Sequence, residues 1–275
     1  MLKSVPVLLA CLALAPHASV YAGANWPVLP LSVEETAAIG QAQELGREIF
    51  LHDQAAALVS DEVVKLTAAG EPRGMQGWVT QRHGQQLAVT FIATAADGGL
   101  AALYRGMVAD GRLLDKVVEL APPQPLSEFE AAALAARKTA SASGFARCAP
   151  RYNTVVLPGM AGGERKWSVY LLPGTTRKDL VPLGGSYRVE TDFSGTKLIA
   201  IHPYTRSCLH LQREPSAVAM MTTHLLHPVP TDVHVYWQLW SRMPLIVATQ
   251  PEAVWALADG KITLMKRGDS AQQTK

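Results

Sequence analysis

Residues 77–120 read GWVTQRHGQQLAVTFIATAADGGLAALYRGMVADGRLLDKVVEL, and this stretch decides the fold class. Runs rich in β-branched and aromatic residues are separated by the short sequences HG (83–84), DGG (97–99) and DG (110–111), which are typical of hairpin turns. Parallel strands need a crossover of about a dozen residues or more, so these closely spaced strands are predicted to be antiparallel. The expected strands of this β meander are 78–80, 87–92, 103–104 and 117–118.

A helix is predicted before the meander. The residues SVEE (32–35) have the pattern of a capping box, in which the serine hydroxyl and the glutamate carboxylate satisfy each other's backbone amides. Over 45–66, apolar residues recur at steps of three and four, the spacing of one buried helical face, until a glycine and a proline within 70–72 stop it. Gly40 and Gly46 are candidate breaks that would divide this helical segment into two pieces.

A second helix is predicted after the meander. The prolines within 122–125 end the last strand, and SEFE (127–130) repeats the capping-box pattern at the start of an alanine-rich helix that reaches about residue 141. The simplest arrangement places this helix over one face of the sheet.

The C-terminal half, after Cys148, is predicted to be nearly all β. Its turn residues argue for a second antiparallel sheet, which either packs separately or continues the first. The fold class is therefore α+β, with a single domain over 25–266, a possible seam at 141–148 and a disordered polar tail over 267–275. The strands expected in this half are 167–172, 186–191, 197–202, 208–212, 217–226, 232–239, 245–249 and 254–262, the last with a turn at 259–260.

Residues 1–24 have the organisation of a secretory signal peptide. One cation, Lys3, precedes an apolar run over 5–15, and small residues follow, with cleavage expected after Ala22 or Ala24. The apolar run is shorter than the roughly 20 residues that span a bilayer. Cys11 offers an alternative lipoprotein reading, but the apolar stretch before it is short and continues beyond it. The mature chain is therefore expected in the periplasm or secreted, with no membrane span once the leader is removed.

The composition excludes some partners. With 25 basic and 23 acidic residues the chain is close to neutral, and its basic clusters are no longer than the pairs at 165–166 and 177–178. Such a chain has no electrostatic footprint for nucleic acid or for an anionic membrane surface. A hydrophobic content of 48% is enough for a proper core.

Cys148 and Cys208 are the two cysteines that would remain after leader removal. In an exported chain such a pair predicts one disulfide, and the chain-entropy model assigns about 4 kcal/mol to closing a loop of about 60 residues. Two alternatives stay open at this point: two unpaired thiols, or a nucleophilic cysteine with a histidine partner. Nothing in the sequence near either cysteine favours a reactive thiolate.

Histidines are concentrated in the C-terminal half. His224, His227, His234 and Asp232 place three imidazoles and a carboxylate close together in the sequence, a ligand set that zinc accepts. The spacing fits no established zinc motif, and residues three apart on a strand point to opposite faces. Structural histidines on the solvated face of a sheet are the ordinary alternative. His52, alone on an apolar helical stripe, is expected to be a packed core residue.

The predicted strand 232–239 also carries a candidate binding surface. Its apolar face holds Trp237, a ring expected to serve the core. His234 and Tyr236 fall on the other face, and Trp240 continues it. A row of exposed rings of this kind could bind a sugar or a peptide, whereas a solvated polar stripe is the plainer interpretation.

Other short motifs fail on context. The residues SGTK (194–197) have the letters of Ser-x-x-Lys, but they lie in a predicted hairpin turn instead of at the start of a helix. The glycine-rich stretch 159–163 is followed by a strand, so no helix N-terminus is available there to hold phosphate. The sequence has no HExxH, Walker A, GxSxG, CxxC or dinucleotide-binding pattern.

Five segments carry a resemblance: RYNTVVLP (151–158), GGSYR (184–188), TRSCL (205–209), THLL (223–226) and PTDVHV (230–235). Together they resemble a group of uncharacterised exported proteins of Gram-negative bacteria that have no assigned activity. The resemblance covers most of the mature chain. It implies an envelope location and a single α+β unit, and it implies no functional residue.

The leader and the lack of a catalytic pattern predict a non-enzymatic binding or accessory role in the cell envelope, without a cofactor. The expected partner is an envelope protein or a small ligand. The alternative prediction is a zinc-dependent hydrolase in which His224, His227 and His234 hold the metal and Asp232 acts as a ligand or base.

Overall fold

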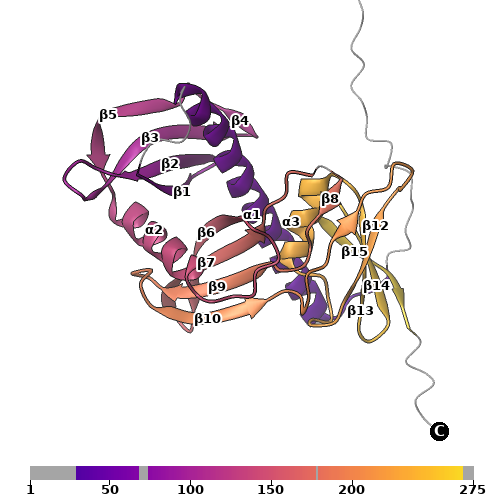
Figure 1. Ribbon diagram of the computed structural model, residues 1–275. Helices are drawn as coiled ribbons and strands as arrows, with labels where there is room; N and C mark the ends of the chain where they lie inside the picture. Colours follow the sequence, from indigo (N-terminus) through magenta and orange to yellow (C-terminus); the bar gives the residue numbers. More distant parts are fainter. Residues whose placement is uncertain (1–28, 68–73, 178, 269–275) are drawn as a thin grey trace, which may run out of the picture.

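The computed structural model describes residues 29–67, 74–177 and 179–268. Over these residues helices and mostly antiparallel strands form an α+β fold, which confirms the predicted class (Figure 1). The signal peptide expected at 1–24 and the helix stop expected at 70–72 lie outside the described residues. No helix within the described ranges is both long and apolar enough to cross a membrane.

The first sheet is the predicted meander, with all of its pairs antiparallel. β3 lies beside β2 and also pairs with both β4 and β5, at opposite ends. The prolines at 122–125 do not end the meander as expected but lie inside β5. β5 pairs with β3 alone, and an edge strand tolerates proline because its outer amides join no ladder. The strands are β1 (Met75–His83), β2 (Gln86–Thr94), β3 (Leu100–Ala109), β4 (Arg112–Leu113) and β5 (Val118–Pro125).

Helix α1 (Val33–Leu66) begins at the predicted capping box and runs without interruption. Neither Gly40 nor Gly46 breaks it: Gly40 is exposed, and Gly46 lies where α1 crosses α3. The first half of α1 belongs to a core shared with the C-terminal sheet, and its second half covers the first sheet (Figure 1). Packing along its whole length offsets the low helix propensity of the two glycines.

The second sheet does not continue the first. It contains β6 (Tyr152–Ala161), β7 (Glu164–Pro173), β9 (Tyr187–Asp192) and β10 (Leu198–Pro203), in the antiparallel order β10-β9-β7-β6. The edge strand β6 was not among the predicted strands. The expected strand 208–212 is reduced to β11 (Leu211–Gln212), which pairs with β8 (Leu180–Val181) in a separate ladder.

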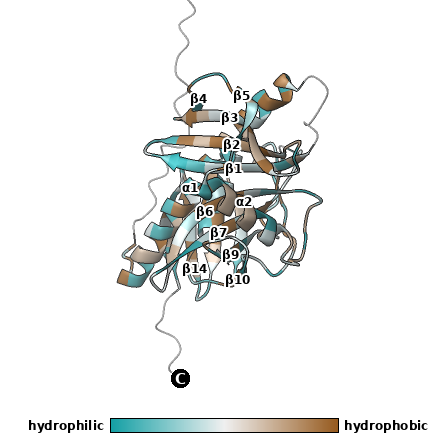
Figure 2. Ribbon diagram, turned by 90° about the vertical axis from the view of Figure 1, so that its left-hand side faces the viewer, coloured by the Kyte–Doolittle hydropathy of each residue, from teal (hydrophilic) through white to brown (hydrophobic). Residues whose placement is uncertain are grey.

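Both faces of the second sheet are covered. Side chains alternate along β7, so Trp167, Val169 and Leu171 pack with α2 (Glu128–Ser141), whereas Tyr170 and Leu172 join the core that contains α1. Helix α2 was expected on one face of the first sheet. It contacts β1 of that sheet but also β6, β7 and β9, and lies between the two sheets (Figure 2).

The prediction of a strand at 232–239 is wrong, because these residues belong to helix α3 (Asp232–Ser241), which lies against the third main sheet. The helix is the crossover that lets β12 (Met220–His224) pair in parallel with β13 (Leu245–Thr249). β14 (Ala253–Ala258) and β15 (Lys261–Arg267) complete the sheet with antiparallel pairs. β15 includes Arg267, the first residue of the expected tail, and residues 269–275 lie outside the described part of the chain.

The alternation of apolar and polar residues in 232–239 wrongly predicted a strand because α3 is buried on nearly all sides, between α1 and the third sheet. Seven of its ten residues are buried, polar ones included, so a two-residue period carries no information about the backbone. The valines at 233 and 235 favour a strand by propensity, but tertiary packing overrides that preference.

The predicted disulfide between Cys148 and Cys208 is present. It joins the segment between α2 and β6 to the segment between β10 and β11. It therefore closes a covalent loop around the second sheet.

Candidate functional site

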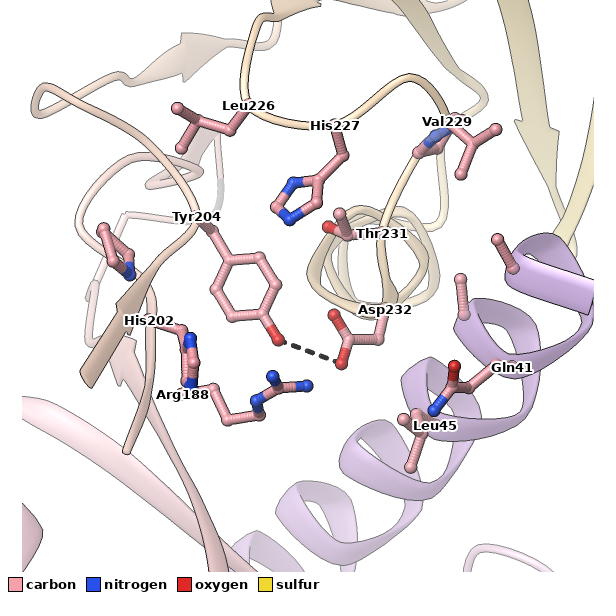
Figure 3. A pocket seen from close by; sticks show the side chains of 14 residues that line it. Gln41, Leu45, Arg188, His202, Tyr204, Leu226, His227, Val229, Thr231 and Asp232 are labelled. Carbon is pink, nitrogen blue, oxygen red and sulfur yellow. Dashed lines mark hydrogen bonds between the residues drawn. The ribbon is translucent and has the colours of Figure 1, made fainter. Parts of the chain in front are cut away.

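A cavity of about 420 Å³ lies between α1, the second sheet and the connection from β12 to α3. Figure 3 shows its lining side chains converging from these elements. Each of these elements contributes both apolar and polar side chains. The apolar residues are Ala38, Ala42, Leu45, Pro203, Leu226, Val229 and Pro230, and the polar residues are Gln41, Arg188, His202, Tyr204, His227, Thr231 and Asp232.

The strand register of the second sheet places part of the polar lining. In β9, Arg188 lies opposite Tyr170 of β7 and His202 of β10, so the three form one row across the sheet. The next residue, Val189, points to the other face and packs with α2. The apolar residues at the alternate positions of these strands pack in the core with α2, so the side chains of the row point to the other face of the sheet, toward the cavity.

Asp232, the first residue of α3, is the buried carboxylate of the cavity and is 5% exposed. Its Oδ2 accepts hydrogen bonds of 3.0 Å from the hydroxyls of Tyr170 and Tyr204, and its Oδ1 accepts the Val233 amide at 2.9 Å. Burial raises the pKa of Asp232, and the two tyrosine hydrogen bonds oppose that rise. Burial, and then the nearby Asp232 charge, raise the pKa of both tyrosines well above the usual value, so both act as donors.

Arg188 is the cation of the cavity, and its side chain is 31% exposed. Its buried Nε has no hydrogen-bond partner among the described residues. Burial lowers the pKa of Arg188, but the neighbouring Tyr204, Tyr170, Asp232 and Glu190 outweigh that effect and raise it. The Nε lies 3.5 Å from Oε1 of Glu190, but that carboxylate is held by Lys166 at 2.7 Å. Figure 3 shows the guanidinium beside Asp232 and the hydroxyl of Tyr204.

The three histidines singled out from the sequence do come together. His224 Nε2 is 3.0 Å from His227 Nδ1 with the rings stacked, and the ring of His234 meets that of His224 edge-on at 4.6 Å between centroids. The stacking arises because β12 ends at His224, so the rule for residues three apart on a strand does not apply. His234 Nδ1 lies 2.8 Å from the Thr231 hydroxyl.

In the part of the chain that the structure describes, no three histidine, cysteine, aspartate or glutamate side chains form a group that could hold a metal. The zinc-dependent hydrolase stays a prediction. The predicted binding surface is corrected: His234 and Tyr236 are 2% and 1% exposed, because they lie in a buried helix. Tyr236 donates to Asp53, and Trp240 is half-buried with its ring edge-on to Trp237.

The histidine cluster predicts a loss of stability in mild acid. Burial, with the neighbouring His227, lowers the pKa of His224 to about 4. The unfolded chain protonates this histidine near its ordinary pKa of about 6.5, so the unfolded state binds more protons between those values and stability falls as the pH is lowered through that window. We expect urea unfolding of His224→Gln to depend less on pH between 7.5 and 5 than that of the wild type.

The matched control for this measurement is His210→Gln, at an exposed position. Asp53 and Asp232, whose pKa values are raised by burial, oppose the trend in every variant, so the difference between slopes is the quantity to compare. Equal slopes in His224→Gln and the wild type would contradict the assignment.

A second cavity, of about 250 Å³, lies between α1, β1 and β6. Its polar groups are already paired: His52 Nδ1 lies 2.6 Å from the Thr80 hydroxyl, and Arg82 donates to both oxygens of Glu48 at 2.9 Å. These contacts fasten α1 to the first sheet. His52 is 3% exposed, which confirms the core position expected for it.

The polar lining of the first cavity was missed in the sequence, apart from His227 and Asp232. Arg188 and Tyr170 belong to strands that were predicted, but the sequence does not show which face of the second sheet meets α1. The available signal was that a basic and an aromatic side chain occupy positions alternating with Val169 and Val189.

In comparisons with known proteins, the chain matches no family model, no curated protein and no solved structure.

Proposed function

We propose that this protein binds a small organic molecule in the cavity between α1, the second sheet and the start of α3, as an exported protein of the cell envelope. The observation that carries the proposal is a cavity of about 420 Å³ whose lining combines apolar side chains with a group of convergent polar ones. Ligand pockets of about 300 to 1,000 Å³ with a mostly apolar lining and a few convergent polar groups are typical of small-molecule sites.

Binding is favoured over catalysis by how the polar groups are engaged. The carboxylate of Asp232 accepts from three protein donors. One ring nitrogen of His227 is occupied by His224. These groups are held in place by protein partners, which suits a preformed site that orients a ligand.

Two features support the envelope location. The first is the leader expected at 1–24, and the second is the disulfide, because disulfides persist in oxidising compartments. Amino-terminal sequencing of the protein recovered from a periplasmic fraction checks the location, with Gly23 or Asn25 expected as the first residue. Recovery of the uncut chain from the cytosol, with Cys148 and Cys208 both open to alkylation, would contradict it.

The binding proposal is tested by filling the cavity. Ala38 lines it from α1 and is half-buried, whereas the neighbouring Ala37 is exposed and does not line it. In a thermal-shift screen of small organic compounds, we expect ligands that raise the Tm of the wild type and of Ala37→Trp but not that of Ala38→Trp. A ligand at a hundred times its Kd adds about 2.7 kcal/mol to the free energy of unfolding. Compounds that stabilise Ala38→Trp equally well bind elsewhere, and that result would sink the proposal.

A further inference from the structure

The position of Arg188 in the cavity indicates what a ligand must supply. A guanidinium has five N–H donors, and this one lines the cavity with its side chain 31% exposed and its buried Nε without a partner among the described residues. Each nearby carboxylate has donors of its own: Lys166 holds Glu190, and two tyrosines and a backbone amide hold Asp232. In the second cavity, by contrast, three nitrogens of Arg82 donate to protein acceptors, two to Glu48 and one to the carbonyl of Gly84.

The charges around the cavity limit how negative that ligand can be. Asp232 stands in the first turn of α3, where the helix macrodipole favours a carboxylate, and the charge of Arg188 also favours its ionised form, so part of the positive charge of Arg188 is already offset. Glu190 also lies beside Arg188, and a hydrogen bond and charge from Lys166 hold its pKa below the usual range despite partial burial. A singly charged group is therefore accommodated more easily than a dianion such as a phosphate monoester.

The apolar lining defines the rest of the ligand. Leu45 from α1 and Leu226 and Val229 from the connection to α3 are part of that lining. These side chains offer no hydrogen bond and favour a hydrocarbon body. A planar carboxylate matches the fork of the guanidinium with two parallel hydrogen bonds.

Resting on the proposed function, we infer that the ligand is a small monocarboxylic acid whose carboxylate is held by Arg188 and whose apolar body lies against Leu45, Leu226 and Val229. Arg188 is then the residue that determines specificity for acids over their uncharged analogues. The polar row supplies the recognition, and the apolar lining supplies most of the buried area.

The experiment measures calorimetric binding of hexanoate and phenylacetate and of the two corresponding primary amides. The amides keep the size and the apolar body but carry no charge. We expect the acids to bind the wild type about tenfold to a hundredfold more tightly than the amides, the range of a charge-assisted hydrogen-bonded contact. Arg188→Gln should abolish this preference, whereas Arg188→Lys, which keeps the charge but loses the fork, should retain part of it.

Arg213→Gln is the matched control, since Arg213 is exposed and does not line the cavity. It should bind like the wild type, and circular dichroism checks that each variant is folded. Equal binding of acids and amides to the wild type and to Arg188→Gln overturns the carboxylate but leaves the cavity as a binding site. Binding of the acids that persists in Ala38→Trp overturns both proposals. Failure of the wild type to bind either acid overturns the carboxylate alone, because the compound screen tests the cavity separately.

Discussion

Replacing Cys148 and Cys208 together by alanine is expected to lower the free energy of unfolding by about 4 kcal/mol. The physical reason is the sequence separation of 60 residues between the bonded cysteines, because the bond removes many conformations from the unfolded chain. The loop contains β6, β7, β9 and β10, so it encloses the whole second sheet. Urea denaturation followed by tryptophan fluorescence measures the effect as a shift of the midpoint.

The single variant Cys148→Ala is the control for this prediction. It breaks the same covalent loop while leaving Cys208 in place, and it should lose nearly as much stability as the double variant. Reduction of the wild type should reproduce the same midpoint. A loss below about 1 kcal/mol in the double variant would show that the unfolded chain is restrained by other means.

The second large effect is expected at the crossing of α1 and α3. A Cβ atom added at Gly46 would lie 2.5 Å from the Cβ of Val235 and 2.6 Å from the carbonyl oxygen of Asp232. Both neighbours are held, one by the core and the other by the α3 backbone, so the helices must separate. Gly46→Ala is expected to destabilise the protein by about 2 to 3 kcal/mol, the usual cost of overpacking.

Gly40→Ala is the matched control on the same helix. Nothing lies within 4 Å of a Cβ at Gly40, so alanine there should add about 0.5 to 1 kcal/mol of stability through helix propensity alone. Thermal unfolding of the two variants should therefore shift in opposite directions. Two shifts of the same sign would contradict the close crossing.

The features that local rules control could be predicted from the sequence. The capping serines at 32 and 127 begin helices, and the glycine turns near 84, 98 and 111 separate strands, because each depends on backbone geometry within a few residues. The disulfide also followed from composition, since the sequence has two cysteines beyond residue 24.

The elements that depend on distant neighbours could not be predicted in the same way. Residues 232–239 read as a strand because burial on nearly all sides removes the helical period from the pattern. One local signal did point the other way: Thr231 follows Pro230 and precedes Asp232, the arrangement of a helix start. The same error produced the wrong binding surface, because a strand over these residues would expose His234 and Tyr236, whereas in α3 both are buried.

The long α1 helix has a kinetic consequence. Glu35 accepts two hydrogen bonds from Arg267, and Gln43 accepts one from the Ile262 amide, so the first helix of the described chain is bonded to the last strand. Contacts between such distant parts of a chain form late in folding, because a long loop must close first. The second half of α1 can pack on the first sheet early, but its first half cannot acquire its β15 neighbours until the ribosome has synthesised nearly the whole chain.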